Sequence, residues 1–165
     1  MLKEKSMFTN PLTERLAAFL RGIGIDVRAA TLPEKTFLPG LAIEHGAILV
    51  DERRLSHPGD LLHEAGHLAV ADLAERNAPT LSPTPADELT SIAWSYAALR
   101  HLELEPGIVF HPDGYKGGSA SIAENFTQGN YFGVPLLQLY GMTVEPRFAA
   151  ERGVEPYPHM LRWLR

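Results

Sequence analysis

Two histidines and a glutamate stand close together near the middle of the chain, in the segment His63-Glu64-Ala65-Gly66-His67. Residues four positions apart lie on one face of an α-helix, so both imidazoles can bind the same metal ion. Glu64, beside His63, can reach a water molecule on that ion. The spacing therefore predicts a zinc site in which His63 and His67 are ligands and Glu64 is the general base.

The composition restricts which metal site the chain can build. Its 165 residues include no cysteine, so an ion must be held by histidine and carboxylate side chains. Hydrophobic residues make up 45% and charged residues 21%, as in folded soluble proteins, and the length suits a single domain over residues 1–165. The formal net charge of -5 lacks the positive field that phosphate binding needs, so nucleic acid is not an expected partner.

The apolar segments are too short or too interrupted for a membrane. The run from Leu16 to Leu20 ends at Arg21, which makes it too brief for a secretory signal. The charge-free stretch 125–144 is broken by several polar residues and by Pro135. We therefore expect a cytoplasmic protein with no membrane partner, and the sequence leaves the oligomeric state open.

The motif is expected on a helix within an α+β fold. An amphipathic pattern begins near Ser56 and places both motif histidines away from the core-facing positions. Three prolines within 78–85 must end this helix. The expected elements are, in order, a helix from Asn10-Pro11 to Gly22, a strand within 23–29, a hairpin of 41–44 and 47–50 around His45-Gly46, a helix from 56 to about 77, a helix from about 86 to 104, helical pieces near 119–127 and 134–140, and a short turn after Pro156.

These features resemble the zincin metallopeptidases, in which a small mixed sheet packs on the motif helix and a second helix supplies a third ligand. The metzincin branch requires H-E-x-x-H-x-x-G-x-x-H, and Val70 and Leu73 stand at its last two fixed positions, so that branch is excluded. The gluzincin branch uses a glutamate on the following helix. That resemblance implies Glu88 as the third ligand, with Asp87 as its chief competitor and Glu103 or Glu105 behind it.

Within the gluzincins, the order of elements is most similar to the ImmA/IrrE-type metallopeptidases, over about residues 10–105. The resemblance implies a minimal zincin-like fold, in which a small mixed sheet packs on the motif helix and the glutamate-bearing helix, with a helical C-terminal part. Ile92 replaces an aspartate that some gluzincins use to orient a histidine, so Asp60 or Asp87 would have to serve instead. The DNA-binding segment of many members is not visible.

The implied activity is zinc-dependent hydrolysis of a peptide bond in a peptide or protein substrate. Zinc would lower the pKa of water towards about 7, and Glu64 would take a proton and pass it to the leaving amine. The glycine-rich loop 110–118 would supply an oxyanion donor, with Tyr115 and His111 as candidates. The substrate would extend along an edge strand, either 47–50 or 41–44.

A catalytically silent zincin-like module that binds metal for a regulatory or interaction role is the alternative, and hydrolysis of a non-peptide amide is a third possibility. Glu64 favours an enzyme, because a structural zinc site needs no base beside its histidines. The remaining aromatic and histidine residues are expected to have other roles. Trp94 and Tyr96 are assigned to the core, and His45, His57, His101 and His159 to structural or solvated positions.

Overall fold

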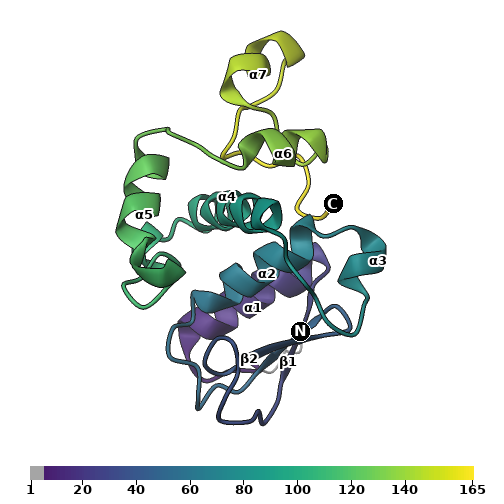
Figure 1. The fold of residues 1–165 in the computed structure, drawn as a ribbon, viewed down its shortest axis with the longest axis vertical. Helices are drawn as coiled ribbons and strands as arrows, with labels where there is room; N and C mark the ends of the chain where they lie inside the picture. Colours follow the sequence, from purple (N-terminus) through teal and green to yellow (C-terminus); the bar gives the residue numbers. More distant parts are fainter. Residues whose placement is uncertain (1–5) are drawn as a thin grey trace, which may run out of the picture.

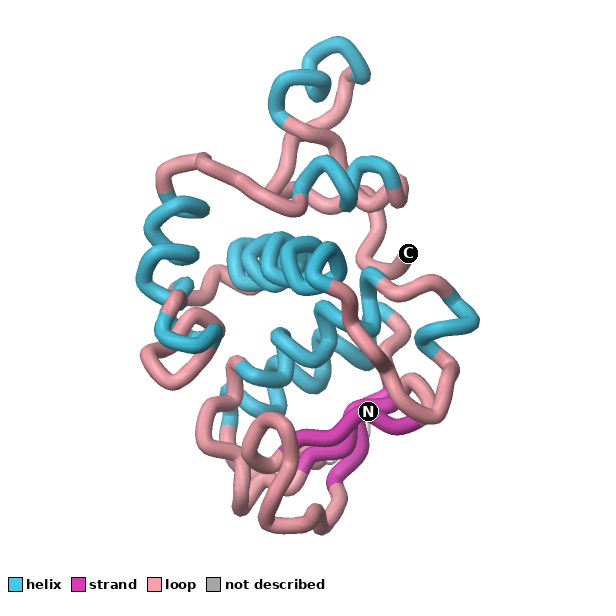
Figure 2. Tube along the Cα trace, in the orientation of Figure 1, coloured by secondary structure: helices cyan, strands magenta, loops and turns pink. Residues whose placement is uncertain are grey.

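The structure is a computed structural model that describes residues 6–165. It is a mixed α+β protein in which the sheet, the helices and a helical C-terminal part follow one another along the longest axis (Figure 1). Figure 2 shows the strands gathered at one end. The elements are α1 (Pro11–Ile23), β1 (Asp26–Ala29), β2 (Leu41–Glu44), β3 (Ala47–Val50), α2 (Asp60–Val70), α3 (Leu73–Arg76), α4 (Pro85–His101), η1 (Pro106–Ile108), η2 (Tyr115–Gly117), α5 (Ser119–Thr127), α6 (Val134–Leu139) and α7 (Pro146–Arg152).

Helix α1 begins as the sequence predicts. The Asn10 side chain accepts hydrogen bonds from the backbone N–H groups of Leu12 and Thr13, and Pro11 takes the first helical position. The helix ends at Gly24, whose φ of 103° is left-handed and suits a residue without a side chain. Helix α1 then packs against β1 and α2, so it forms the layer behind the motif helix.

The sheet has the strand order β1-β3-β2, with β1 parallel and β2 antiparallel to β3. The predicted hairpin is confirmed, because Leu41–Glu44 pairs with Ala47–Val50 across a turn at His45 and Gly46. Both turn residues have positive φ, 48° and 78°, which matches the twist of two-residue hairpins. Because β3 is central, β2 is the edge strand on the side away from β1.

Helix α4 lies across α2, and the two helices form the centre of the molecule (Figure 1). The Ser95 hydroxyl lies 2.8 Å from the Ser91 carbonyl oxygen on its own helix and 3.2 Å from the Leu62 carbonyl oxygen on α2. At the start of α2, a Cβ on Gly59 would overlap the carbonyl group of Ile108. These close approaches fix both α4 and the segment after it against the motif helix.

The C-terminal part is attached to the far side of α4. The Tyr157 hydroxyl donates a hydrogen bond to the Ala93 carbonyl at 2.8 Å, and the Trp94 indole N–H donates to the Trp163 carbonyl at 2.9 Å. Trp94 and Tyr96 are 0% and 5% exposed, which confirms their assignment to the core. Helix α7 projects furthest from the sheet (Figure 1).

The helix expected from 56 to 77 is wrong at both ends. It begins at Asp60 rather than at Ser56, and it stops at Ala71, whose ψ of 146° is extended. The Asp72 side chain then accepts a hydrogen bond from the Glu75 N–H, and the Glu75 side chain accepts one from the Asp72 N–H. Such a capping box starts a new helix. The two helices were predicted as one because the apolar periodicity continues across the break between them.

The C-terminal elements also differ from expectation. Helix α4 ends at His101, three residues before the predicted Leu104. The short turn expected after Pro156 is present at residues 157–158. Helix α7 was missed, although Pro146 at its first position and Gly153 just beyond its end, with φ 65°, are typical helix boundaries. No helix in 6–165 combines the length and the apolarity that crossing a bilayer requires.

Candidate metal centre

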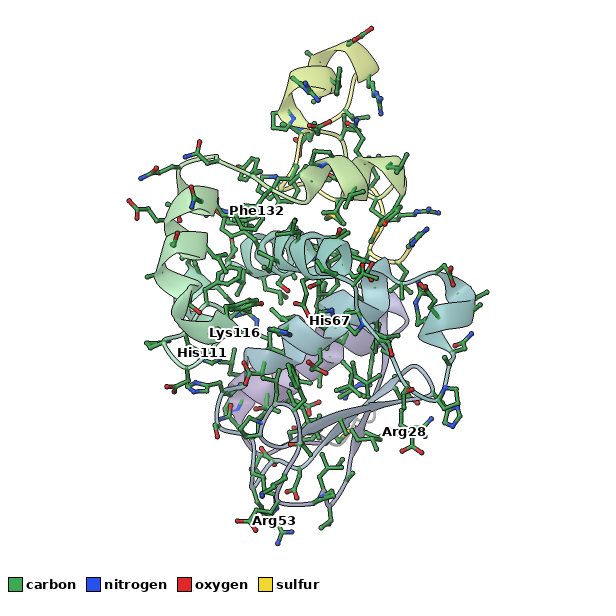
Figure 3. All side chains as sticks on the ribbon, viewed as in Figure 1. Arg28, Arg53, His67, His111, Lys116 and Phe132 are labelled. Atoms are coloured by element: carbon green, nitrogen blue, oxygen red, sulfur yellow. The ribbon has the colours of Figure 1, made fainter. Side chains whose placement is uncertain are left out.

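The three side chains expected to bind metal lie together between α2 and α4. His63 and His67 are one turn apart on α2, and their ring centroids are 5.1 Å apart. One ligand atom from each of His63, His67 and Glu88 lies within 4.8 Å of the other two. Figure 3 shows His67 near the centre of the molecule, where α2 passes under α4.

Of the two adjacent carboxylates on α4, Glu88 is the one beside the histidines. Its Oε1 lies 3.5 Å from Nε2 of His67, and its side chain is 44% exposed. Asp87 is engaged elsewhere: its Oδ2 accepts hydrogen bonds from the N–H and the hydroxyl of Thr84, both at 2.7 Å. Asp87 therefore caps α4, and its position leaves Glu88 as the ligand candidate on that helix.

The histidines are in the protonation state that binds metal. Burial lowers the pKa of His63 to about 4, with a further contribution from the nearby His67, and burial lowers the pKa of His67 to about 4. Both rings are thus neutral at pH 7. Nδ1 of His67 is buried without a hydrogen-bond partner among residues 6–165. Two neutral imidazoles and one carboxylate form a donor set that fits zinc.

Glu64 is buried beside these ligands. Glu64 is only 8% exposed and lies on the same helix as both histidines. Burial raises the pKa of Glu64 to about 7, and the negative charges of Asp60 and Glu88 add to the shift. A carboxyl group with a pKa near the working pH is suited to accept and return a proton.

The apolar face of α2 lies in the core as expected, but the histidine face is largely covered as well. Helix α2 is buried on nearly every side, and His67 is 5% exposed. The reason is that α4 and the segment after it cover the face that carries the motif. The amphipathic pattern alone could not show this cover, because the covering residues come from a distant part of the chain.

Tyr115 and His111 differ in their surroundings. The Tyr115 ring lies 4.8 Å from the His63 ring, and burial, followed by the charges of Glu88 and Asp60, raises the pKa of Tyr115 above its usual value. Tyr115 thus keeps its proton and can donate a hydrogen bond near the motif. Nε2 of His111 lies 2.6 Å from Oδ1 of Asp60, so that nitrogen is already engaged. The geometry favours Tyr115 as the donor.

Neither carboxylate suggested for orienting a motif histidine does so within the described part of the chain. Asp60 is paired with His111, and Asp87 caps α4. His57 was assigned to a structural or solvated position, but it lies against His111, with ring centroids 3.6 Å apart. No spacing rule could have joined these residues, since 54 positions of chain separate His57 from His111.

A cleft of about 550 Å³ opens above the motif. Its floor includes Glu64, His67 and Glu88, and one side is formed by the edge strand β2. The other side is the proline-rich segment between α3 and α4. Most of its wall residues are apolar: Phe37, Leu41, Ala42, Ile43, Leu81 and Pro83. Of the two strands considered for substrate binding, Leu41–Glu44 lies at the cleft, whereas Ala47–Val50 is central in the sheet and was the wrong choice.

Comparison of the chain with protein-family models, with curated proteins and with solved structures finds no match. The site itself therefore holds the evidence for a function. Its distinguishing features are the donor cluster of His63, His67 and Glu88, the buried Glu64 and the cleft above them.

Proposed function

We propose that the protein is a zinc-dependent peptidase of the gluzincin type, similar to the minimal ImmA/IrrE-type enzymes. The observation that carries this proposal is the convergence of His63, His67 and Glu88 within 4.8 Å, beside a cleft that His67 and Glu88 line. These residues would hold the ion. Zinc bound there supplies Lewis-acid polarisation and makes water acidic enough to ionise near pH 7.

The protein's own groups would act around the scissile amide. Glu64, buried and with a pKa of about 7, would take a proton from the attacking water and return it to the leaving nitrogen. Tyr115, protonated and 4.8 Å from the His63 ring, would donate a hydrogen bond to the developing oxyanion. The apolar walls would exclude bulk water and strengthen both interactions.

The cleft favours an extended peptide as the substrate. Strand β2 is at the edge of the sheet and forms one wall, so a peptide can add to it through backbone hydrogen bonds. Alternate side chains would then face the apolar wall formed by Phe37, Leu81 and Pro83. We therefore expect cleavage next to apolar residues.

The substitution Glu64→Gln tests the proposal, because it keeps the size of the side chain and removes the base. The variant should keep its zinc and lose hydrolysis by about 100-fold or more. The measurement is cleavage of a diverse peptide library by zinc-loaded protein, with products identified by mass spectrometry and zinc content determined in parallel. Glu151→Gln, on the exposed surface of α7, is the matched control and should cleave normally.

Cleavage by Glu64→Gln at the wild-type rate would refute the role of Glu64. A wild-type protein that binds stoichiometric zinc and cleaves no peptide in the library would instead support the silent module. His63→Ala and His67→Ala should each lose the one zinc ion that the motif binds, with the circular dichroism unchanged. A protein without a metal site at the motif would show no such loss.

A further inference from the structure

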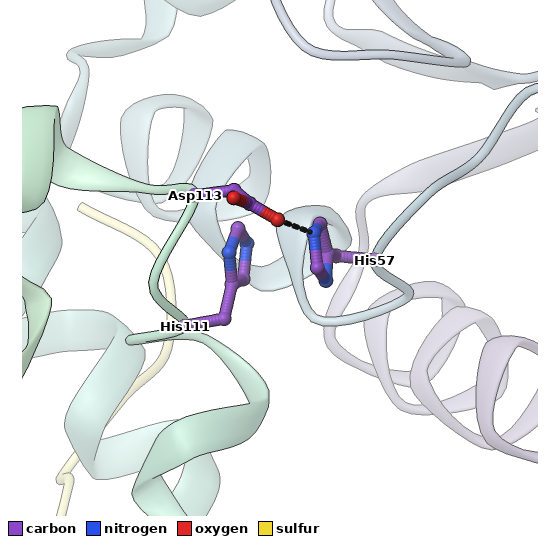
Figure 4. A group of neighbouring side chains, drawn as sticks. All are labelled: His57, His111 and Asp113. Carbon is purple, nitrogen blue, oxygen red and sulfur yellow. Dashed lines mark hydrogen bonds and ion pairs between the residues drawn. The ribbon is translucent and has the colours of Figure 1, made fainter.

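A second group of donor side chains lies at the start of α2, on the side of the loop that follows α4. One ligand atom from each of His57, His111 and Asp113 lies within 4.8 Å of the other two. Figure 4 shows the three side chains, with His57 and Asp113 joined by a hydrogen bond. None of them belongs to the cluster of His63, His67 and Glu88.

His111 has one engaged nitrogen and one free nitrogen. The residue is 6% exposed, and its Nε2 lies 2.6 Å from Oδ1 of Asp60. Its Nδ1 is buried and has no hydrogen-bond partner among the described residues. When Nε2–H donates to Asp60, Nδ1 carries a lone pair with no donor. Metal-bound histidines are commonly held in this way, by a carboxylate on the nitrogen that does not bind the ion.

His57 and Asp113 supply the other two donors. The His57 ring stacks on His111 with an interplanar angle of 12°, and its Nε2 lies 2.9 Å from Oδ2 of Asp113. Ligand atoms of a tetrahedral zinc site are separated by about 3.3 Å, given bonds of about 2.0 Å. Because the two rings are stacked and each lone pair lies in the plane of its ring, the His57 ring would have to turn out of the stack for one ion to bind both imidazoles. His57 and Asp113 are 32% and 78% exposed, so both side chains have room to turn.

We propose that His57, His111 and Asp113 form a second site, for a divalent transition-metal ion such as zinc. Two imidazoles and one carboxylate suit zinc or a neighbouring first-row ion, whereas calcium and magnesium prefer oxygen ligands alone. The ion would join the segment before α2 to the loop that carries Tyr115. It would thus hold that loop against the start of the motif helix, four residues before Glu64.

The site can be tested apart from the proposed catalytic centre. In a chain carrying both His63→Ala and His67→Ala, the motif no longer binds an ion, so any remaining stoichiometric zinc belongs to the second site. Calorimetric titration with zinc alone should show one ion per chain. Adding Asp113→Asn or His57→Ala should weaken that binding at least 10-fold, as expected when one of three ligands is lost. Magnesium should not compete.

The matched control is His159→Ala in the same background. His159 also pairs with a carboxylate, its Nδ1 lying 3.6 Å from Oε2 of Glu155, but the pair is exposed and has no third donor in the described clusters. This control should bind zinc normally. Cobalt absorption gives a second readout, because nitrogen ligands in a tetrahedral field produce intense visible bands that Asp113→Asn should weaken.

Zinc should also raise the thermal midpoint of the double variant, because an ion that binds only the folded state stabilises it. The proposal is overturned if this variant, shown to be folded by circular dichroism, binds no zinc at micromolar concentration. It is equally overturned if Asp113→Asn and His57→Ala bind zinc as tightly as the background. Both residues are partly or largely exposed, at 32% for His57, so these variants should fold.

Discussion

Gly66 lies directly against the backbone of Ser91: a Cβ built on Gly66 would be 2.9 Å from the Ser91 carbonyl oxygen. It would also be 3.1 Å from the Ser91 Cβ and 3.2 Å from the Ser95 hydroxyl. The variable position of the motif just before His67 is therefore constrained by packing. Its lack of a side chain lets α4 approach α2, and that approach brings Glu88 to His67.

Gly66→Ala should destabilise the fold by about 1–3 kcal/mol, because the added methyl group meets backbone atoms that cannot move aside easily. In an exposed helix the same change stabilises by about 1 kcal/mol. Gly22→Ala in α1 is the control, since nothing lies within 4 Å of the added atom. Urea unfolding should thus give opposite signs for the two variants. A stabilised Gly66→Ala would contradict the close contact of α2 and α4.

Glu88→Ala and Asp87→Ala should have different effects. Glu88→Ala should weaken zinc binding at least 10-fold, because a ligand is lost, with little change in stability. Asp87→Ala should cost about 1 kcal/mol of stability, because the hydrogen bonds with Thr84 at the start of α4 are lost, and should leave zinc affinity nearly unchanged. Chelator competition and urea unfolding measure the two quantities. The reverse ranking of zinc affinities would assign the ligand to Asp87.

Local rules predicted the parts of the fold that are set within a few residues. Asn10 and Pro11 fixed the start of α1, and His45 with Gly46 fixed the hairpin, because caps and tight turns depend on neighbouring backbone groups. The same rules missed the break at Ala71, because the apolar periodicity continues into α3. Asp72 is a helix-capping residue and was the local signal for this break, but the periodicity was given more weight.

The candidate site likewise has a part that local rules predict and a part that they do not. The spacing of His63 and His67 follows from one helical turn, so their proximity was predictable from sequence. The contact of His111 with Asp60 and His57 was not, because it depends on the path of the loop after α4. The close fit of Gly59 against Ile108 fixes that path, and a glycine and an isoleucine in the sequence do not indicate that they will be in contact.

Glu52 gives the fold a measurable acid sensitivity. Its carboxylate accepts hydrogen bonds from the N–H groups of Asn10 at 2.6 Å and Thr9 at 3.1 Å, and these bonds lower its pKa from 4.5. The ionised form is therefore favoured in the folded state. Its stabilisation is present above the unfolded-state pKa and is lost as the pH falls through the lower folded-state value.

Glu52→Gln should accordingly be less stable than the wild type at pH 7, and the difference should shrink between about pH 5 and about pH 3. Urea unfolding across this range measures the effect. Glu151→Gln, on α7, should follow the wild-type curve. A stability difference between Glu52→Gln and the wild type that stays constant down to pH 3 would show that the carboxylate charge is not the cause.

Tyr115→Phe separates the oxyanion donor from the metal ligands. The hydroxyl is expected to contact the substrate only as negative charge develops, so its removal should lower kcat by about 100-fold and leave KM nearly unchanged. Zinc content should stay the same, because the proposed ligands are His63, His67 and Glu88. Tyr140→Phe is the control. The Tyr140 ring stacks against Arg165, with its centroid 3.8 Å from the guanidinium carbon, whereas the Tyr115 ring lies beside His63. If Tyr115→Phe kept its kcat and His111→Gln lost it, the donor would be His111, and the pairing of His111 with Asp60 would then serve catalysis rather than a second ion.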